Sequence, residues 1–468
     1  MTIHKTKSSR YTALCIALIM ICGSTTLQAG ILKSTIGRSE TDTITEIPSQ
    51  LPAKKYSFME RADLSMDPAG FKIRGTKGWS WTADQYMAEI PVLSKYKMNF
   101  LMGCYISMFS MPLHQDSLWK LTTVKNEWWL PIPEPKKRAF EQVFKTSKEY
   151  GISYCFGIHP QLSSPRPADL SSVKDFEDLW QHYAWAQNNG VRWFSLPLDD
   201  VTKVKIDGKE HALFVNKLLN RLREKDKDAQ MVFCPTYYHV DPNNLKDKEK
   251  KYYEDLSKHL DKSVYVFWTG TSILPKTVST ADAGKFRELA DHRIIFWENY
   301  PVNDAWQTMH LAPITGRDEK LHTVLDGYMS NPMFQQNEMN RIPLFTQADY
   351  TYDPANYDPA KSIAQAIIHQ TDSKSQQDVL HQVVELFSRG ITNNAGIGIN
   401  PVLDHFKRIS SVPFSRPVAD IFVEHVKTVQ FKLHKEFPNQ YMAAKKTLAI
   451  TIQKLEDAYR KKYASALN

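Results

Sequence analysis

Short apolar runs alternate with amphipathic segments from residue 71 to about residue 331. Near-continuous apolar strands separated by helices are typical of a parallel sheet that is covered on both faces. Eight such units over roughly 260 residues predict an α/β fold, a (β/α)8 TIM barrel. The eight runs are Phe71–Gly75, Met98–Ile106, Ile152–Pro160, Val191–Leu198, Met231–Tyr238, Val264–Gly270, Arg293–Tyr300 and Leu325–Asn331.

Helical spacing is clear between most of these runs, at Lys137–Tyr150, Val173–Asn188, Glu210–Glu224 and Ala281–Ala290. A doubly wound open sheet is the alternative to a barrel. No Gly-rich phosphate loop follows the first run, so we favour the barrel.

The pattern changes after about residue 360. Lys361–Gln370, Gln376–Ser388, Val418–Lys432 and Asn439–Tyr463 have helical spacing, with Gly- or Pro-containing breaks between them. We therefore predict a catalytic barrel over residues 66–360 and an all-helical C-terminal domain over residues 361–468. Residues 30–65 are polar and contain proline, which is typical of a linker.

The first 29 residues have the pattern of a signal peptide. Lys5, Lys7 and Arg10 precede an apolar run over residues 13–22, and Leu27-Gln28-Ala29 is a plausible cleavage site. We therefore expect an exported protein, either periplasmic or secreted. No later stretch has eighteen uninterrupted apolar residues, so no transmembrane helix is expected.

Charge and cysteine content point to no special partner. The formal net charge is +8, and the densest charged run, residues 246–251, mixes both signs, so no nucleic-acid surface is predicted. Outside the signal peptide, Cys104, Cys155 and Cys234 each lie in an apolar run, which favours buried free thiols over disulfides or a metal site. No metal or cofactor is expected, and the oligomeric state stays open.

Two adjacent carboxylates, Asp199 and Asp200, stand where the fourth apolar run ends. An adjacent Asp pair more often caps a helix or lies in a solvated loop. At the end of a buried strand, however, an unpaired carboxylate is unfavourable and needs a reason. Chemistry that uses two carboxylates differently is one such reason.

Most other strand ends carry polar or aromatic residues as well. In a barrel the carboxyl ends of the strands form one mouth, so these residues should converge there. Tryptophan, tyrosine and amide side chains beside two acids suit a carbohydrate better than most ligands. The ends are His159-Pro160, Asp199-Asp200, Tyr237-Tyr238-His239, Trp268-Thr269-Gly270, Trp297–Tyr300 and Ser330-Asn331.

Adjacent acids restrict the possible mechanism. Most glycosidases place two carboxyls on opposite sides of the scissile bond, and neighbours on one strand point to opposite faces. Adjacent acids fit substrate-assisted hydrolysis, in which the 2-acetamido carbonyl of the sugar attacks the anomeric carbon. One acid then polarises the acetamide N–H and the other protonates the leaving oxygen, so their pKa values must differ.

Five segments together resemble glycoside hydrolase family 84, the β-N-acetylglucosaminidases that include the O-GlcNAcases. Their order and spacing match over roughly residues 70–360, and a helical domain after the barrel is also similar to the family. The segment with Asn-Tyr-Pro-Val-Asn-Asp is the most specific of the five. They are Phe194–Val201, Cys234–Tyr238, Phe267–Gly270, Trp297–Asp304 and Ser330–Met333.

The resemblance implies residue roles. Asp199 would polarise the acetamide, Asp200 would be the general acid/base, and Tyr238 would bind the acetamide carbonyl. Asp304 would bind the O4 and O6 hydroxyls, and Gly78 is the match for a sugar-binding glycine. The remaining candidates line the pocket: Trp297 as a wall of the acetamide site, Asn299 at the acetamide or leaving oxygen, Asn331 at the rim, and Trp268 at the end of the sixth run.

The chain departs from the family at its first two strands. Residues 74–81 are shorter than the family's opening motif and lack its Tyr-Gly, and residues 103–107 lack its sugar-binding lysine. The acetamide side is therefore similar to the family, whereas the hydroxyl-reading side differs. We hypothesise a β-N-acetylhexosaminidase of GlcNAc or GalNAc specificity. The alternatives are a non-catalytic carbohydrate-binding protein and a hydrolase of glycans that lack an acetamide; exo or endo action stays open.

Overall fold

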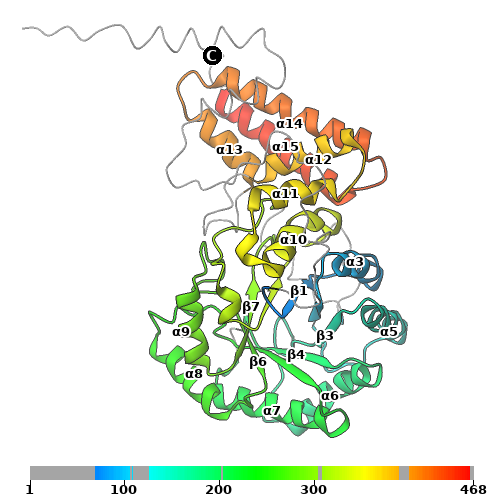
Figure 1. Cartoon of the computed structure of the whole chain (residues 1–468), viewed down its shortest axis with the longest axis vertical. Helices are drawn as coiled ribbons and strands as arrows, with labels where there is room; N and C mark the ends of the chain where they lie inside the picture. The colour runs from blue at the N-terminus through cyan, green and yellow to red at the C-terminus, as the bar shows by residue number, and fades with distance from the viewer. Residues whose placement is uncertain are drawn as a thin grey trace, which may run out of the picture.

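The computed structural model describes residues 69–105, 108, 126–201, 204–303, 308–388 and 400–463. Eight parallel strands close into a barrel in sequence order, as the sequence predicts (Figure 1). The predicted signal peptide and linker, up to residue 65, lie outside the described residues. The strands are β1 Ile73–Gly78, β2 Phe100–Gly103, β3 Ser153–Gly157, β4 Trp193–Pro197, β5 Gln230–Cys234, β6 Tyr265–Trp268, β7 Arg293–Glu298 and β8 Gly327–Ser330.

Helices between the strands cover the outside of the barrel. Many begin at a side-chain cap: Ser172 accepts from the Asp175 amide at the start of α6, and Asp207 accepts from the Glu210 amide at α7. Such caps satisfy amide groups that the first helical turn leaves unpaired. The helices are α3 Ala83–Lys95, α5 Glu134–Glu149, α6 Val173–Asn188, α7 Gly208–Lys225, α8 Asp247–His259 and α9 Thr280–Ala290, with a short helix η2 Leu321–Thr323 before β8.

The strands alternate between two apolar environments. On β4, Phe194 and Leu196 pack into the helix-facing core, while Trp193 packs against the side chains that fill the lumen. This alternation follows from the two-residue period of a strand. The lumen side chains include Phe100, Met102, Cys155, Val232, Cys234, Phe267, Ile295, Trp297 and Met329.

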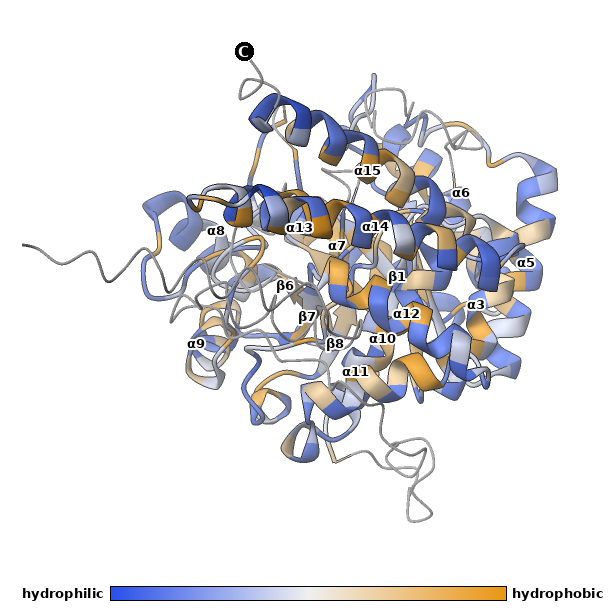
Figure 2. Cartoon of the chain, turned by 90° about the horizontal axis from the view of Figure 1, so that it is seen from above, coloured by the Kyte–Doolittle hydropathy of each residue, from blue (hydrophilic) through white to orange (hydrophobic). Residues whose placement is uncertain are grey.

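After β8 the chain is helical. Helix α10 is buried on nearly all sides and contacts β1, β8, α3 and α11. Figure 1 shows the later helices at one end of the molecule, and Figure 2 shows polar residues on the outer faces of α14 and α15. The helices are α10 Asn337–Tyr352, η3 Pro354–Asn356, α11 Pro359–Ile368, α12 Lys374–Phe387, α13 Pro401–Ser410, α14 Arg416–Glu436 and α15 Met442–Tyr463.

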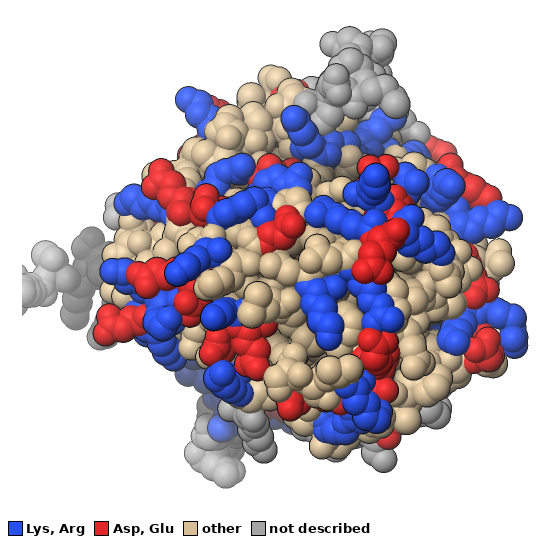
Figure 3. Space-filling view, turned by 90° about the horizontal axis from the view of Figure 1, so that it is seen from below, with Lys and Arg blue, Asp and Glu red and all other residues tan. Residues whose placement is uncertain are grey.

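Cysteine and surface features agree with the sequence reading. Cys104, Cys155 and Cys234 are buried free thiols, as predicted. On the face opposite the C-terminal helices, basic and acidic side chains are interspersed (Figure 3). Among the helices that the structure describes, none combines the length and apolar character needed to cross a membrane.

Candidate active site

The acid pair lies at the carboxyl end of β4. Asp199 lies an even number of residues after the lumen-facing Trp193, so it lies on the same inward side, and it is 6% exposed. Asp200 is exposed at the mouth of the barrel. The backbone of Asp200 is left-handed, with φ of 53°. Non-glycine residues adopt this conformation at an energetic expense, often at functional sites, and Asp tolerates it better than most. The strand thus buries one carboxylate and turns the next toward the opening.

Neighbouring strand ends hold the pair in place. The Thr236 hydroxyl donates to the Leu198 carbonyl at 2.6 Å, and His159 Nε2 lies 2.8 Å from the Asp199 carbonyl oxygen. The other ring nitrogen of His159 accepts from the amides of Gln161 and Leu162, at 3.3 and 3.1 Å. His159 Nε2 must therefore carry the proton and donate it.

His159 is neutral at physiological pH, because burial lowers its pKa to about 4. Its ring lies 5.3 Å from that of Tyr105, in an edge-to-face arrangement. The residue therefore positions the backbone of the acid pair and adds no charge to the site.

The two carboxylates have different electrostatic surroundings. Burial raises the pKa of Asp199, and the positive charge of Lys77 opposes this effect. Enclosure by protein and repulsion from Asp199 both raise the pKa of Asp200, although its side chain opens onto the mouth. An ionised Asp199 therefore favours a protonated Asp200, which is the division that an acid/base pair needs.

The acid pair also differs in its hydrogen bonds. Tyr238 follows β5, and its hydroxyl donates to Asp200 Oδ1 at 2.7 Å. Asp199 Oδ1 is buried with no hydrogen-bond partner among the described residues; His159 Nε2, 3.6 Å away, is beyond hydrogen-bond range. A buried acceptor without a partner is unfavourable unless a ligand supplies the donor.

Three predicted pocket residues meet at the ends of β7 and β8. Trp297 points into the lumen, edge-to-face with Phe267 at 5.0 Å, and its indole nitrogen has no partner among the described residues. Asn331 Nδ2 donates to Asn299 Oδ1 at 3.0 Å, and Asn299 Nδ2 donates to the Ile273 carbonyl at 3.0 Å. The structure thus brings Trp297, Asn299 and Asn331 to the same barrel mouth as the acid pair.

Two predicted substrate-binding residues, Trp268 and Gly78, make contacts within the protein. Trp268 is fully buried on the helix-facing side, stacked on Phe286 of α9 at 4.8 Å and 8°. The carbonyl of Gly78 already accepts from the Tyr86 hydroxyl at 2.9 Å and the Trp81 amide at 3.2 Å. Trp268 thus lies in the core and Gly78 packs against Tyr86, and the contacts predicted for both residues with a substrate stay predictions.

The close packing at Gly78 explains why a glycine is needed. A β-carbon there would lie 2.2 Å from the Tyr86 ring on α3, which no rearrangement of that buried ring could easily relieve. The predicted Asp304 lies outside the described residues, so its position relative to the mouth stays a prediction.

Sequence reasoning missed Lys77. The predicted first strand ends at Gly75, but β1 extends to Gly78 and carries Lys77 with the inward parity of Ile73. The lysine is 2% exposed and faces the lumen side chain Trp297. Extending the predicted strand by two residues, from Gly75 to Lys77, would have placed the lysine on the same inward side as Ile73.

A third carboxylate at the mouth is excluded from the chemistry. Glu298, the last residue of β7, points outward and binds the Arg317 guanidinium through both oxygens, at 2.7 and 2.8 Å. The Tyr328 hydroxyl also donates to it at 2.5 Å. Fully bonded to its neighbours, Glu298 anchors the end of the strand and is not available as a nucleophile.

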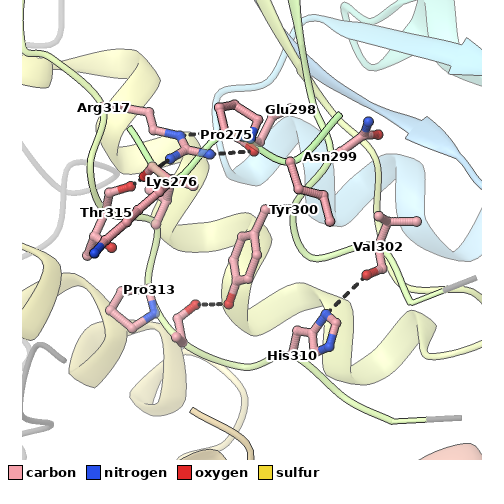
Figure 4. Close-up of a pocket in the computed structure, with 13 residues that line it drawn as sticks. Pro275, Lys276, Glu298, Asn299, Tyr300, Val302, His310, Pro313, Thr315 and Arg317 are labelled. Carbon is pink, nitrogen blue, oxygen red and sulfur yellow. Dashed lines mark hydrogen bonds and ion pairs between the residues drawn. The ribbon is translucent and has the colours of Figure 1, made fainter. Parts of the chain in front are cut away.

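The cavity beside Glu298 is structural too (Figure 4). Its volume is about 70 Å³, well below the roughly 300–1,000 Å³ of ordinary ligand pockets. Two of its polar side chains bond to the backbone around it: the Tyr300 hydroxyl donates to the Ala312 carbonyl, and His310 Nδ1 binds the Val302 carbonyl. No group of three or more His, Cys, Asp or Glu side chains suited to a metal ion occurs within the described ranges.

Two carboxylates of different environment at the mouth of a TIM barrel are an arrangement that glycoside hydrolysis can use. The model of the β-N-acetylglucosaminidase family matches residues 73–385, well over half of the chain. The chain belongs to this family.

Solved structures agree with the fold. CpGH84B has a TM-score of 0.65 and 22% identity, and the match covers 83% of this chain and 67% of that one. An O-GlcNAc hydrolase of Thermobaculum terrenum, in a mutant form, has a TM-score of 0.64 and 20% identity, covering 86% of this chain and 88% of that one. At these identities the structural likeness supports the fold of this chain.

Proposed function

We propose that this glycoside hydrolase is a retaining β-N-acetylhexosaminidase that releases terminal 2-acetamido-2-deoxy-β-hexosides through an oxazoline intermediate. The observation that carries the proposal is the unpartnered, buried Oδ1 of Asp199 beside an Asp200 that opens onto the mouth. An acetamide N–H is a donor that suits this oxygen.

The proposed reaction has two displacements at the anomeric carbon. In the first, the acetamide oxygen attacks that carbon, the glycosidic bond breaks, and Asp200 gives its proton to the leaving oxygen. Asp199 accepts the acetamide N–H and stabilises the positive charge that develops there. In the second, water attacks the anomeric carbon, the bond from that carbon to the acetamide oxygen breaks, and Asp200 takes a proton from the water. Two inversions leave the anomeric configuration unchanged.

A protein nucleophile is the less favoured alternative. A retaining enzyme of that type needs a second carboxylate about 5–5.5 Å from the acid, across the sugar. Glu298 is bound by Arg317 and Tyr328 on the outside of the barrel and cannot serve. A non-catalytic binding protein would have no need of the elevated pKa of Asp200.

The sugar specificity is proposed to be either GlcNAc or GalNAc. The family match favours GlcNAc. The first strand differs from the family pattern, and there Lys77 faces the lumen and Trp79 its rim. This difference favours a change in how the enzyme binds the hydroxyl groups of the sugar ring. A switch to β-GalNAc, which differs from GlcNAc at O4, is the alternative.

A panel of p-nitrophenyl 2-acetamido-β-sugars with a thiazoline inhibitor tests the proposal. We expect release of p-nitrophenol from the GlcNAc or GalNAc glycoside, and tight competitive inhibition by the thiazoline, because it mimics the oxazoline. The matching p-nitrophenyl β-glucoside lacks the acetamide and serves as the control, with no turnover expected. Sugar binding without product would instead identify a binding protein, and turnover of the glucoside a protein nucleophile. Equal or greater GlcNAc turnover would remove the GalNAc alternative.

The pH dependence of kcat/KM should be bell-shaped. Activity rises as Asp199 ionises and falls as Asp200 loses its proton, and burial raises the pKa of both above the ordinary 3.8. Both limbs should therefore lie above that value; they belong to the coupled pair and not to one residue. Initial rates at low substrate concentration across the acidic and neutral range measure them. An acid limb at or below the ordinary Asp value contradicts the assignment.

A further inference from the structure

Lys77 is a charged residue built into the lumen of the barrel. It occupies an inward position on β1, paired in register with Met102 of β2, and its side chain is only 2% exposed. Burying an ammonium group is unfavourable unless it is paired or hydrogen-bonded. A lysine at this position therefore needs a specific partner.

Three aromatic rings surround the ammonium. Lys77 Nζ lies 4.3 Å from the ring centroid of Trp79, 4.7 Å from that of Tyr105 and 4.7 Å from that of Trp297. Ring faces attract a cation, but they do not replace the oxygen acceptors that its three N–H groups require. The rings therefore hold the charge in place and leave its hydrogen bonds unmade.

No conventional acceptor takes those N–H groups within the part of the chain that the structure describes. No carboxylate there lies within 4.0 Å of Nζ. The neighbours of the ammonium are the rings of Trp79, Tyr105 and Trp297. The positive charge of Lys77 acts on the buried carboxylate of Asp199: it lowers the pKa of Asp199 and so opposes the rise that burial causes. An ammonium and a carboxylate thus face the same lumen, each with hydrogen-bonding capacity to spare.

We propose that Lys77 is a catalytic residue that contacts the substrate and donates a hydrogen bond to an oxygen of the bound 2-acetamido sugar. This inference rests on the proposed hexosaminidase function.

Other titratable groups also face Asp199, so their contributions to its pKa must be the same in the wild type and the variants. His159 is neutral and Cys234 is protonated, because burial lowers the pKa of the imidazole and raises that of the thiol. The groups around Asp199 are Lys77 from β1, Tyr105 after β2, His159 after β3, Asp200 beside it, and Cys234 and Tyr238 from β5 and its end. Among these described neighbours, Lys77 is the positive charge.

The test compares K77M, K77Q and K77R with the wild type on the preferred p-nitrophenyl 2-acetamido-β-sugar. K77M and K77Q remove the charge, and we expect kcat/KM to fall by about 100-fold or more. The acid limb of the pH profile should also move to higher pH by roughly one unit, because Asp199 loses its nearby cation. K77R keeps the charge, so its acid limb should stay near that of the wild type while kcat/KM falls.

Lys72, exposed just before the same strand, gives the control variant K72M, which should match the wild type in both readouts. A merely structural lysine would lower the melting temperature and leave the acid limb unmoved. The inference is overturned if folded K77M or K77Q keeps kcat/KM within threefold and an unshifted acid limb. If the wild type itself hydrolyses no 2-acetamido glycoside, the proposed function fails instead, so the two failures are distinguishable.

Discussion

Asp200→Asn is expected to lower kcat/KM for β-glycosides with poor leaving groups by about 10²- to 10⁴-fold, the usual contribution of a general acid. Asparagine cannot protonate the leaving oxygen, so alkyl glycosides lose most of their turnover. Aryl glycosides with acidic phenols need little protonation and should lose much less. The measurement is kcat/KM against the pKa of the leaving group, which should fall more steeply for the variant than for the wild type.

Asp228→Asn is the matched control for this substitution. Asp228 is exposed in the turn before β5, at the opposite end of the barrel, and the same chemical change there should leave every substrate unaffected. In the Asp200→Asn variant the Tyr238 hydroxyl can donate to the side-chain amide oxygen as it does to the carboxylate, so the geometry of the mouth should survive. An equal loss on good and poor leaving groups would contradict the acid/base role.

Asp199→Asn is the second large effect, with an expected loss of about 10²- to 10³-fold on aryl and alkyl glycosides alike. In the proposed mechanism Asp199 acts on the substrate's own nucleophile, so a good leaving group cannot compensate for the loss of its carboxylate. A neutral amide also stabilises the positive charge of the forming oxazoline less than a carboxylate does. Parallel rate measurements on activated and unactivated glycosides check the expectation.

Thermal unfolding separates this loss from damage to the fold. Asp199 is a buried carboxylate whose pKa is raised by burial, so replacing it with a neutral isostere removes a desolvation penalty. The melting temperature of Asp199→Asn should therefore equal or exceed that of the wild type while activity is lost. Near wild-type hydrolysis of aryl glycosides by this variant would show that Asp199 does not polarise the acetamide.

The eight strands could be predicted because each is a short apolar run between helical segments. The pattern did not show which side chains of a strand face the lumen and which face the helices, because both faces of a barrel strand meet apolar neighbours. Trp268 and Trp297 both lie near strand ends, yet the first packs against helix α9 and the second against the lumen. Only closure of the barrel distinguishes the two tryptophans.

Lys77 and helix α10 were harder to predict for related reasons. A charge interrupts the apolar run of β1, so the predicted strand stopped at Gly75. Two of the three rings around the lysine come from elsewhere in the chain, Tyr105 after β2 and Trp297 on β7. Helix α10 is covered by β1, α3 and α11, so it lacks the single apolar stripe of a surface helix. Both features depend on distant segments.

The hydrogen bonds at the barrel mouth divide it into two parts that tolerate substitutions to different extents. On the side of the mouth that carries the acid pair and the Asn299–Asn331 pair, Thr236 ties β5 to β4, His159 ties β3 to β4, and Asn331 ties β8 to β7. A substitution on that side disturbs at least two strands at once. The turn after β1 is bonded to α3, because the Tyr86 hydroxyl donates to the Gly78 carbonyl. Exchanging the turn after β1 together with α3, with Lys77 of β1 kept, is therefore the most economical route to a changed mouth around the same acid pair.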